Sequence, residues 1–109
     1  MTYYKKRVDE NQKTIVHTFI ALGASVLNLS TVGRGCPDLL IGYRGKSVLV
    51  EVKALKGTFT DPQIKFMKEW RGGPVSRIDS VDAAIRLIKM LDMPKIIKGQ
   101  NMRITAKDF

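Results

Sequence analysis

The chain has 109 residues, of which 44% are hydrophobic, so it is long and apolar enough for one globular domain and is not a disordered chain. Its 19 lysines and arginines outnumber 10 acidic residues and give a net charge of +9, which favours a polyanion as partner. One cysteine and one histidine exclude an internal disulfide and a zinc site built from these ligands.

Nucleic acid is the polyanion that we favour. A membrane surface would require a basic amphipathic helix with exposed Leu or Trp, and no convincing one is found. The other alternative is a charged surface that serves only solubility. Residues 1–10 are too polar for a secretory signal, and no apolar run approaches the roughly 18–20 residues of a membrane span. We therefore expect a soluble cytoplasmic protein.

Hydrophobic periodicity and turn residues predict a helix, three strands, a helix, a strand and a helix, in that order. The predicted elements cover residues 5–22, 25–31, 38–43, 47–53, 60–71, 75–78 and 81–93. This order is typical of an α/β fold in which helices pack on a mixed central sheet. We expect a single domain over residues 1–109, with a core at about 7–92 and a basic arm or frayed tail at 93–109.

Each helix has a predicted apolar stripe and end signals. Gly23 closes the first helix, Thr60 is the expected N-cap of the second and Ser80 that of the third. The expected inward residues are Val8, Ile15, Phe19 and Leu22 in the first helix, Phe66, Met67 and Trp70 in the second, and Val81, Ala84, Ile85, Ile88 and Leu91 in the third.

Asp38, Glu51 and Lys53, the carboxylate–lysine cluster, are the strongest functional signal. Glu51 and Lys53 are two residues apart on one strand and so share a face. The hairpin brings Asp38, at the start of the partner strand, near them. Carboxylate oxygens bind Mg²⁺, and a lysine beside them stabilises charge during phosphodiester hydrolysis. The alternative is a solvated Glu-x-Lys face without a function.

Two glutamines lie on the inward stripes of their helices, Gln12 in the first and Gln63 in the second. A buried amide needs hydrogen-bond partners. One interpretation is that both helices cover the carboxylate–lysine cluster and that the amides hold its water or metal ligands. The alternative is that each amide caps a strand edge or binds a core water.

Basic residues offer further candidates for phosphate contact. Arg34 lies between two glycines beside Asp38, where it either neutralises a phosphate or belongs to an ordinary charged turn. Clusters at both ends of the chain would make sequence-independent contacts or be solvated: Lys5, Lys6 and Arg7, and Lys95, Lys98, Arg103 and Lys107. We expect His17 at the surface and Cys36 as a small loop residue.

In these motifs the sequence resembles the PD-(D/E)xK nuclease superfamily, and more specifically the stand-alone VRR-NUC type found in phages. The resemblance covers about residues 7–92. It is carried by Asp9-Glu10-Asn11-Gln12, by residues 32–40 with Pro37-Asp38, by Leu49-Val50-Glu51-Val52-Lys53, by Thr60-Asp61-Pro62-Gln63 and by Val75-Ser76-Arg77. Ser76 stands where the family motif Val-Arg-Arg has its first arginine.

The resemblance implies a restriction-endonuclease-like core and Mg²⁺- or Mn²⁺-dependent hydrolysis of DNA. It implies that Asp38, Glu51 and the Val52 carbonyl hold the metal, that Lys53 is catalytic and that Gln63 supports it. An acidic residue of the first helix also serves such sites, and helical geometry favours Asp9 over Glu10. Small members resemble homodimeric enzymes that resolve four-way (Holliday) junctions. A phage origin would place the protein in a bacterial host cell.

Two other functions remain open. The first is a non-catalytic DNA-binding module that retains a nuclease fold, against which the intact carboxylate–lysine cluster argues. The second is a structural or partner-binding protein whose charge only aids solubility. A metal titration would distinguish the first from a nuclease, and DNA binding measured across salt concentrations would distinguish the second.

Overall fold

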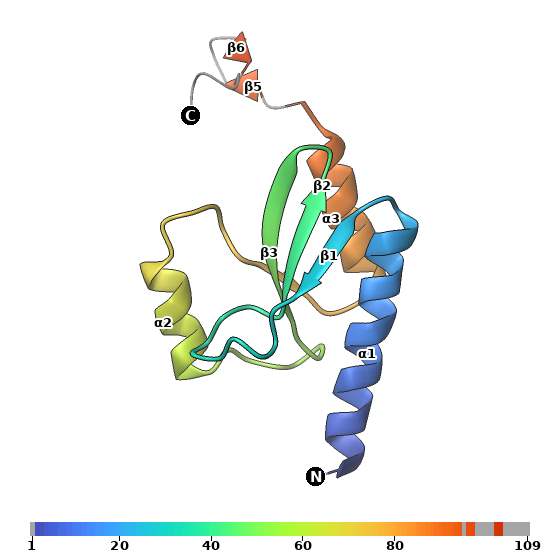
Figure 1. The fold of residues 1–109 in the computed structure, drawn as a ribbon, viewed down its shortest axis with the longest axis vertical. Coiled ribbons are helices and arrows are strands. Elements are labelled where there is room, and N and C mark those ends of the chain that lie inside the picture. The colour runs from blue at the N-terminus through green and yellow to red at the C-terminus, as the bar shows by residue number, and fades with distance from the viewer. Residues whose placement is uncertain (1, 95, 98–101, 104–109) are drawn as a thin grey trace.

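The computed structural model describes residues 2–94, 96–97 and 102–103, with side chains described from residue 10 to 94. Three helices and four strands form the main body (Figure 1). The elements are α1 (Thr2–Ala21), β1 (Ser25–Asn28), β2 (Leu39–Tyr43), β3 (Lys46–Val52), α2 (Asp61–Glu69), β4 (Ser76–Ile78), α3 (Val81–Asp92), β5 (Ile96–Ile97) and β6 (Met102–Arg103).

The central sheet has the strand order β1-β2-β3-β4. The first three strands form an antiparallel meander, and β4 joins β3 in parallel after the chain has passed through α2. Leu39 is paired with Val50, so the register places the residue before β2 opposite Glu51. The sheet therefore brings the Pro37-Asp38 loop to the carboxyl-terminal end of β3.

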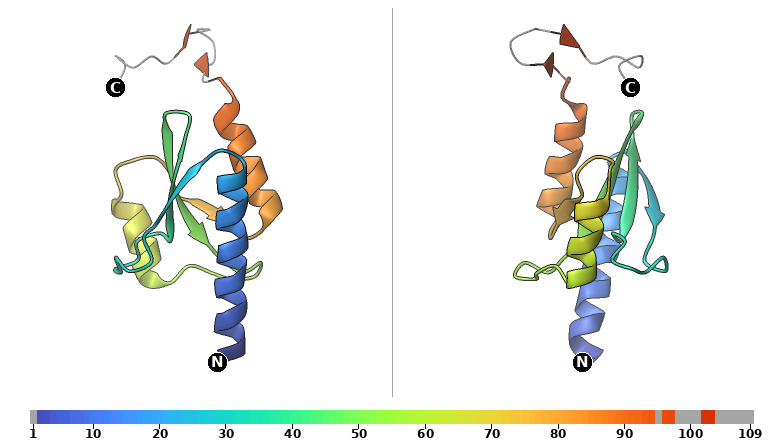
Figure 2. Two further views of the ribbon diagram at one scale, coloured as in Figure 1. Left: turned by 45° about the vertical axis from the view of Figure 1, so that its right-hand side comes forward. Right: turned by 90° about the vertical axis from the view of Figure 1, so that its left-hand side faces the viewer.

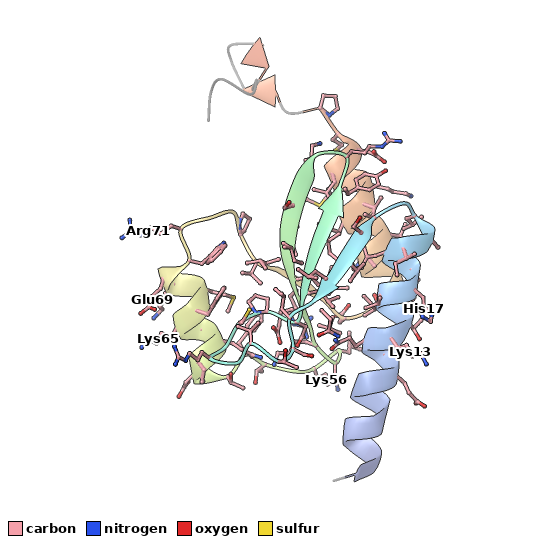
Figure 3. All side chains as sticks on the ribbon, in the orientation of Figure 1. Lys13, His17, Lys56, Lys65, Glu69 and Arg71 are labelled. Atoms are coloured by element: carbon pink, nitrogen blue, oxygen red, sulfur yellow. The ribbon has the colours of Figure 1, made fainter. Side chains whose placement is uncertain are left out.

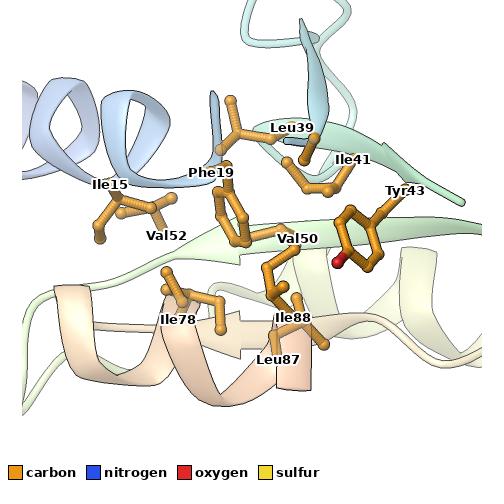
Figure 4. Packing of buried hydrophobic residues seen from close by; sticks show 12 residues of the cluster. Ile15, Phe19, Leu39, Ile41, Tyr43, Val50, Val52, Ile78, Leu87 and Ile88 are labelled. Carbon is orange, nitrogen blue, oxygen red and sulfur yellow. The ribbon is translucent and has the colours of Figure 1, made fainter. Parts of the chain in front are cut away.

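The core lies between one face of this sheet and the helices α1 and α3 (Figures 2 and 4). Ile15 and Phe19 of α1 are fully buried against Leu39, Ile41 and Val50 of the sheet. The remaining core members are Ala24, Tyr43, Val52, Ile78, Ala84, Leu87 and Ile88. Because strand side chains alternate between faces, burial of Val50 and Val52 in this core directs Glu51 to the opposite face.

The expected order of elements is confirmed, and the expected N-cap residues of α2 and α3 are the observed ones, whereas α1 begins at Thr2, before its expected start at Lys5. Thr60 caps α2 with its side chain, Pro62 lies in the first turn, and Ser80 caps α3 by accepting from the Ala83 N–H. Some elements are shorter than expected. For example, β1 ends at Asn28 because the loop turns there, with the Ser30 N–H donating to the Asn28 side chain.

Several expected core positions are wrong. No residue of α2 is buried, so the expected inward stripe of Phe66, Met67 and Trp70 is not part of the core. Trp70 is 47% exposed, and its ring stacks on Phe66 with the ring centroids 5.3 Å apart. Leu22 is 38% exposed at the end of α1, where the chain turns at Gly23. In α3 Leu87, not Ile85, is among the buried residues.

The basic segment after α3 includes the two short paired strands β5 and β6, where no element had been expected. The side chains of its basic residues lie outside the described residues. In the part of the chain that the structure describes, no helix is long and apolar enough to cross a membrane.

Candidate active site

The Asp38 carboxylate lies at the end of β3. Its Oδ2 accepts a hydrogen bond from the Val52 N–H at 2.9 Å, and its own carbonyl accepts from the Leu29 N–H at 2.7 Å. These bonds hold Asp38 from two directions and place its side chain directly opposite Glu51, on the same face of the hairpin. The meeting predicted from the hairpin is confirmed.

Glu51 is 4% exposed, which argues against the alternative of a solvated Glu-x-Lys face. Its Oε2 accepts from Gln63 Nε2 at 2.8 Å and lies 3.9 Å from Lys53 Nζ. Burial raises the pKa of Glu51 from 4.5 to about 7, with a further contribution from the Asp38 charge, and Lys53 opposes the shift. The carboxylates of Asp38 and Glu51 therefore lie close to one ammonium group where little water is present. One positive charge compensates the two negative charges only in part, which disfavours ionisation of both carboxylates.

Gln63 reaches Glu51 because it lies in the first turn of α2. The Thr60 N–H donates to Gln63 Oε1 at 2.9 Å, and the Gln63 N–H donates to Thr60 Oγ1 at 3.3 Å, which completes a capping box. With Oε1 used in this way, the amide NH₂ faces the carboxylate. Gln63 thus joins the helix start to Glu51, as the interpretation of an amide above the cluster had predicted.

Lys53 is largely shielded from solvent, with 16% of its side chain exposed. Its backbone N–H donates to the Ile78 carbonyl at 3.0 Å, which extends the pairing of β3 with β4. Its ammonium lies 5.8 Å from the centre of the Phe59 ring and 3.9 Å from Glu51. The ammonium is thus held between an aromatic face and a carboxylate, with limited access to solvent.

The loop before Asp38 packs against the start of α2 at Gly35. A Cβ at this position would lie 2.1 Å from the Pro62 carbonyl oxygen, and the φ angle is +76°, so a larger residue would displace either the loop or the helix. Beside this contact is a hollow of about 810 Å³, lined by residues that include Arg34, Cys36, Lys65 and Phe66. Burial raises the pKa of the Cys36 thiol, with smaller contributions from Glu51 and Asp38.

The other predicted site residues lie elsewhere or outside the described side chains. Gln12 lines a separate hollow with Asn28 and Ser30, and among the side chains of residues 10–94 it has no hydrogen bond to the carboxylate–lysine cluster. Arg34 is exposed, with a φ angle of +58°. The side chains of Asp9, Lys5, Lys6 and Arg7 lie outside the described residues. Glu10 is exposed, as the predicted helical phase requires.

Sequence reasoning did not find the contacts of Arg77. Its guanidinium donates to the carbonyls of Ala54, Leu55 and Gly57, in the turn that follows Lys53, and pairs with Asp79 at 3.1 Å. Only the position of Arg77 after Val75-Ser76 had been noted. No local pattern signals hydrogen bonds to a turn that lies 20 to 23 residues earlier in the chain.

A solved structure described as a VRR_NUC domain is similar to this chain in fold and sequence. The two are 33% identical with a TM-score of 0.63, and the match covers 75% of this chain and 94% of the other. This chain belongs to the VRR-NUC domain family. The sequence matches no family model and no curated protein.

The family assignment agrees with the observed fold. The mixed four-stranded sheet with three helices is the α/β nuclease-like fold of a VRR-NUC domain. VRR-NUC domains are nucleases, so the assignment indicates a hydrolase with DNA as substrate and suggests the use of a divalent metal. In this VRR-NUC domain the carboxylate–lysine cluster lies at the carboxyl-terminal end of β3, beside the start of α2.

Proposed function

We propose that the protein is a Mg²⁺-dependent DNA endonuclease that cuts branched DNA, with four-way junctions as the favoured substrate. The observation that carries the proposal is Glu51, a carboxylate that is 4% exposed beside Asp38 and only 3.9 Å from the Lys53 ammonium. A protein keeps a buried carboxylate next to another carboxylate at a cost in folding free energy, and functional sites are where such costs occur.

The donor set fits a hard divalent cation. Asp38, Glu51 and the Val52 carbonyl are oxygen ligands, and Mg²⁺ is commonly held by one or two carboxylates together with water and substrate phosphate. In the stretch with described side chains, no three His, Cys, Asp or Glu residues cluster as metal ligands. We propose Asp9 of α1 as a further ligand. When bound, the cation supplies positive charge and Lewis acidity to the scissile phosphate.

The protein groups have separate roles in this proposal. Lys53 stabilises the charge that develops on the phosphate and leaving oxygens, in a position where little water screens it. Gln63 holds Glu51 Oε2 and so orients the carboxylate. The Val52 N–H holds Asp38 Oδ2 and directs the rest of that carboxylate toward Glu51. Gln12 is proposed to act on a water or phosphate at the α1 side.

DNA contact is supported by exposed basic residues on the elements that flank the cluster. In Figure 3, Lys13 lies on α1, Lys65 on α2, and Lys56 between them, beyond the end of β3. All three side chains are exposed. Together with Arg34, Lys5, Lys6 and Arg7, they would bind the DNA backbone without reading its sequence, so affinity should fall steeply with salt.

We propose that residues 7–92 are the catalytic core, that residues 93–109 are a basic arm, and that the active unit is a homodimer. A four-way junction has two-fold symmetry and needs two paired cuts, whereas one chain carries one carboxylate–lysine cluster. A two-fold dimer provides two clusters. Light scattering at micromolar concentration tests this. Paired cutting at full activity by a protein that remains monomeric would contradict it.

The deciding experiment incubates the protein with linear, flapped and four-way DNAs in Mg²⁺, Mn²⁺ or EDTA. We expect cleavage with either metal, none in EDTA, and a preference for the four-way substrate. Binding without cleavage under all three conditions would instead identify a non-catalytic DNA-binding module. Cleavage that persists in EDTA would contradict the metal dependence.

A further inference from the structure

Arg77 lies on the same face of the sheet as the cluster but makes no ion pair with it. In the parallel pairing of β3 with β4 it is the direct partner of Glu51, and its side chain is 30% exposed. The ion pair of Arg77, within residues 10–94, is with Asp79. The guanidinium extends past Glu51 to the next turn of the chain, so its role is not to neutralise that carboxylate.

The segment that Arg77 contacts is the turn of residues 54–57, directly after Lys53. One guanidinium nitrogen, Nη2, donates to the carbonyls of Ala54 at 2.8 Å, Leu55 at 3.1 Å and Gly57 at 3.1 Å. The turn itself is closed by the Gly57 N–H, which donates to the Ala54 carbonyl at 2.8 Å. Three of the four backbone carbonyls in the turn therefore accept from the same NH₂ group of Arg77.

The turn has little else to hold it. Leu55 is 75% exposed and Lys56 is also exposed, so neither side chain anchors the turn in the core. Without buried apolar contacts, a surface turn exchanges among conformations easily. Among the described residues, the hydrogen bonds that tie the carbonyls of this turn to another element of the fold come from Arg77.

The turn lies beside the side chain of Lys53. A Cβ placed on Gly57 would lie 3.6 Å from Lys53 Cδ, so the lysine stem passes the turn with room for about one methyl group between it and Gly57. Because Lys53 directly precedes the turn, movement of the turn would also move the lysine stem and shift the ammonium from its position near Glu51 and Phe59. The turn is also the connection to Phe59, whose ring faces the ammonium.

Asp79 orients the arginine from the other side. Its Oδ2 accepts from Nη1 of Arg77 at 3.1 Å, and its carbonyl accepts from Asn11 Nδ2 at 3.5 Å. A planar guanidinium reaches a carboxylate with one nitrogen and several carbonyls with the other, whereas a lysine ammonium is a single point donor on a differently shaped stem. The arrangement therefore requires arginine in particular.

We propose that Arg77 is a positioning residue for the cleavage reaction: it clamps the 54–57 turn and thereby holds the Lys53 ammonium at the cluster. This inference rests on the proposed nuclease function. It differs from a phosphate-binding role for Arg77, because the guanidinium donates to protein carbonyls, and from a purely structural role, because the segment it holds carries no part of the core.

The test compares Arg77→Ala and Arg77→Lys with the wild-type protein in two measurements. The first is amide hydrogen exchange of Gly57 without DNA. The second is the single-turnover cleavage rate at saturating DNA and Mg²⁺, with DNA affinity measured separately in Ca²⁺.

In both variants we expect Gly57 to exchange about tenfold faster while β2 and α3 keep their protection. We expect the saturated cleavage rate to fall at least about tenfold, since small displacements of a reacting group have large effects, and DNA affinity to change less than about twofold.

Arg44→Ala is the matched control, because Arg44 also pairs with an aspartate, Asp92 at 3.1 Å, but at the far end of the hairpin. It should leave both measurements unchanged. Unaltered Gly57 exchange in Arg77→Ala, or cleavage within twofold of wild type, would overturn the inference. Full activity of Arg77→Lys would also overturn it, because charge alone would then suffice. Failure of the wild-type protein to cut any DNA would refute the proposed function, whereas Gly57 exchange would still report on the clamp.

Discussion

Gln63 donates to Glu51 through Nε2 at 2.8 Å while its Oε1 accepts from the Thr60 N–H at 2.9 Å, so one amide joins a helix start to a buried carboxylate. Gln63→Glu separates these two functions. A glutamate still completes the capping box but cannot donate to Glu51, and it adds a carboxylate. We expect lower thermal stability at neutral pH, because a third carboxylate adjoins Asp38 and Glu51, and at least about a tenfold loss of cleavage rate, because the orientation of Glu51 is lost. Activity equal to wild type would exclude a role for this hydrogen bond.

Lys53→Ala should reduce the single-turnover cleavage rate by at least about 100-fold, as expected for loss of a charge-stabilising group. The side chain contributes little to the core, so the melting temperature and DNA affinity should change little. Lys89→Ala, on the exposed side of α3, is the control for loss of one positive charge. Wild-type rates in Lys53→Ala would refute the assignment of Lys53.

Asp38→Asn and Glu51→Gln should each weaken Mg²⁺ binding, because an amide oxygen is a poorer ligand than a carboxylate for a hard cation. The asparagine oxygen can still accept from the Val52 N–H, so the loop before β2 should stay in place. Isothermal titration calorimetry measures the affinities, with Asp82→Asn on the exposed surface of α3 as the control. Unchanged affinity in both site variants would rule out the proposed ligand set.

The raised pKa of Glu51 predicts a pH dependence of the metal-free protein. With a pKa of about 7 in the folded state, against 4.5 ordinarily, the folded protein binds the Glu51 proton more tightly than the unfolded chain does. Its contribution to stability is therefore most favourable at acidic pH and declines as the pH rises from 4.5 through about 7. Urea unfolding in EDTA measures this, and Glu51→Gln should remove the dependence that Glu51 contributes. No difference in slope between the two proteins would contradict a raised pKa.

Asp9 and Glu10 provide a test of the helical phase of α1. Ile15 and Phe19 are buried and Glu10 is exposed, so the helix turns Glu10 toward solvent. We expect Asp9→Asn to reduce cleavage more than Glu10→Gln, because only Asp9 is proposed to serve the metal. Initial rates at limiting and saturating Mg²⁺ compare the two variants. The opposite order would show that Glu10 is the residue used.

The sequence alone determined which residues meet at the cluster. The period of two along β3 places Glu51 and Lys53 on one face, and the short hairpin connection brings Asp38 opposite Glu51; both relations depend only on local backbone geometry. The N-caps Thr60 and Ser80 were equally predictable, since a capping side chain bonds to backbone groups within three residues.

Only the tertiary structure decided how buried the cluster is and what holds it. Glu51 is removed from solvent because α2 lies beside it with Gln63, whereas Trp70, which follows the same helix, is exposed, since no residue of α2 is buried. The contact of Arg77 with the 54–57 turn arises because β4 pairs with β3 after a long connection. Such relations join segments distant in sequence, and their geometry depends on how whole elements pack, which neither periodicity nor residue type records.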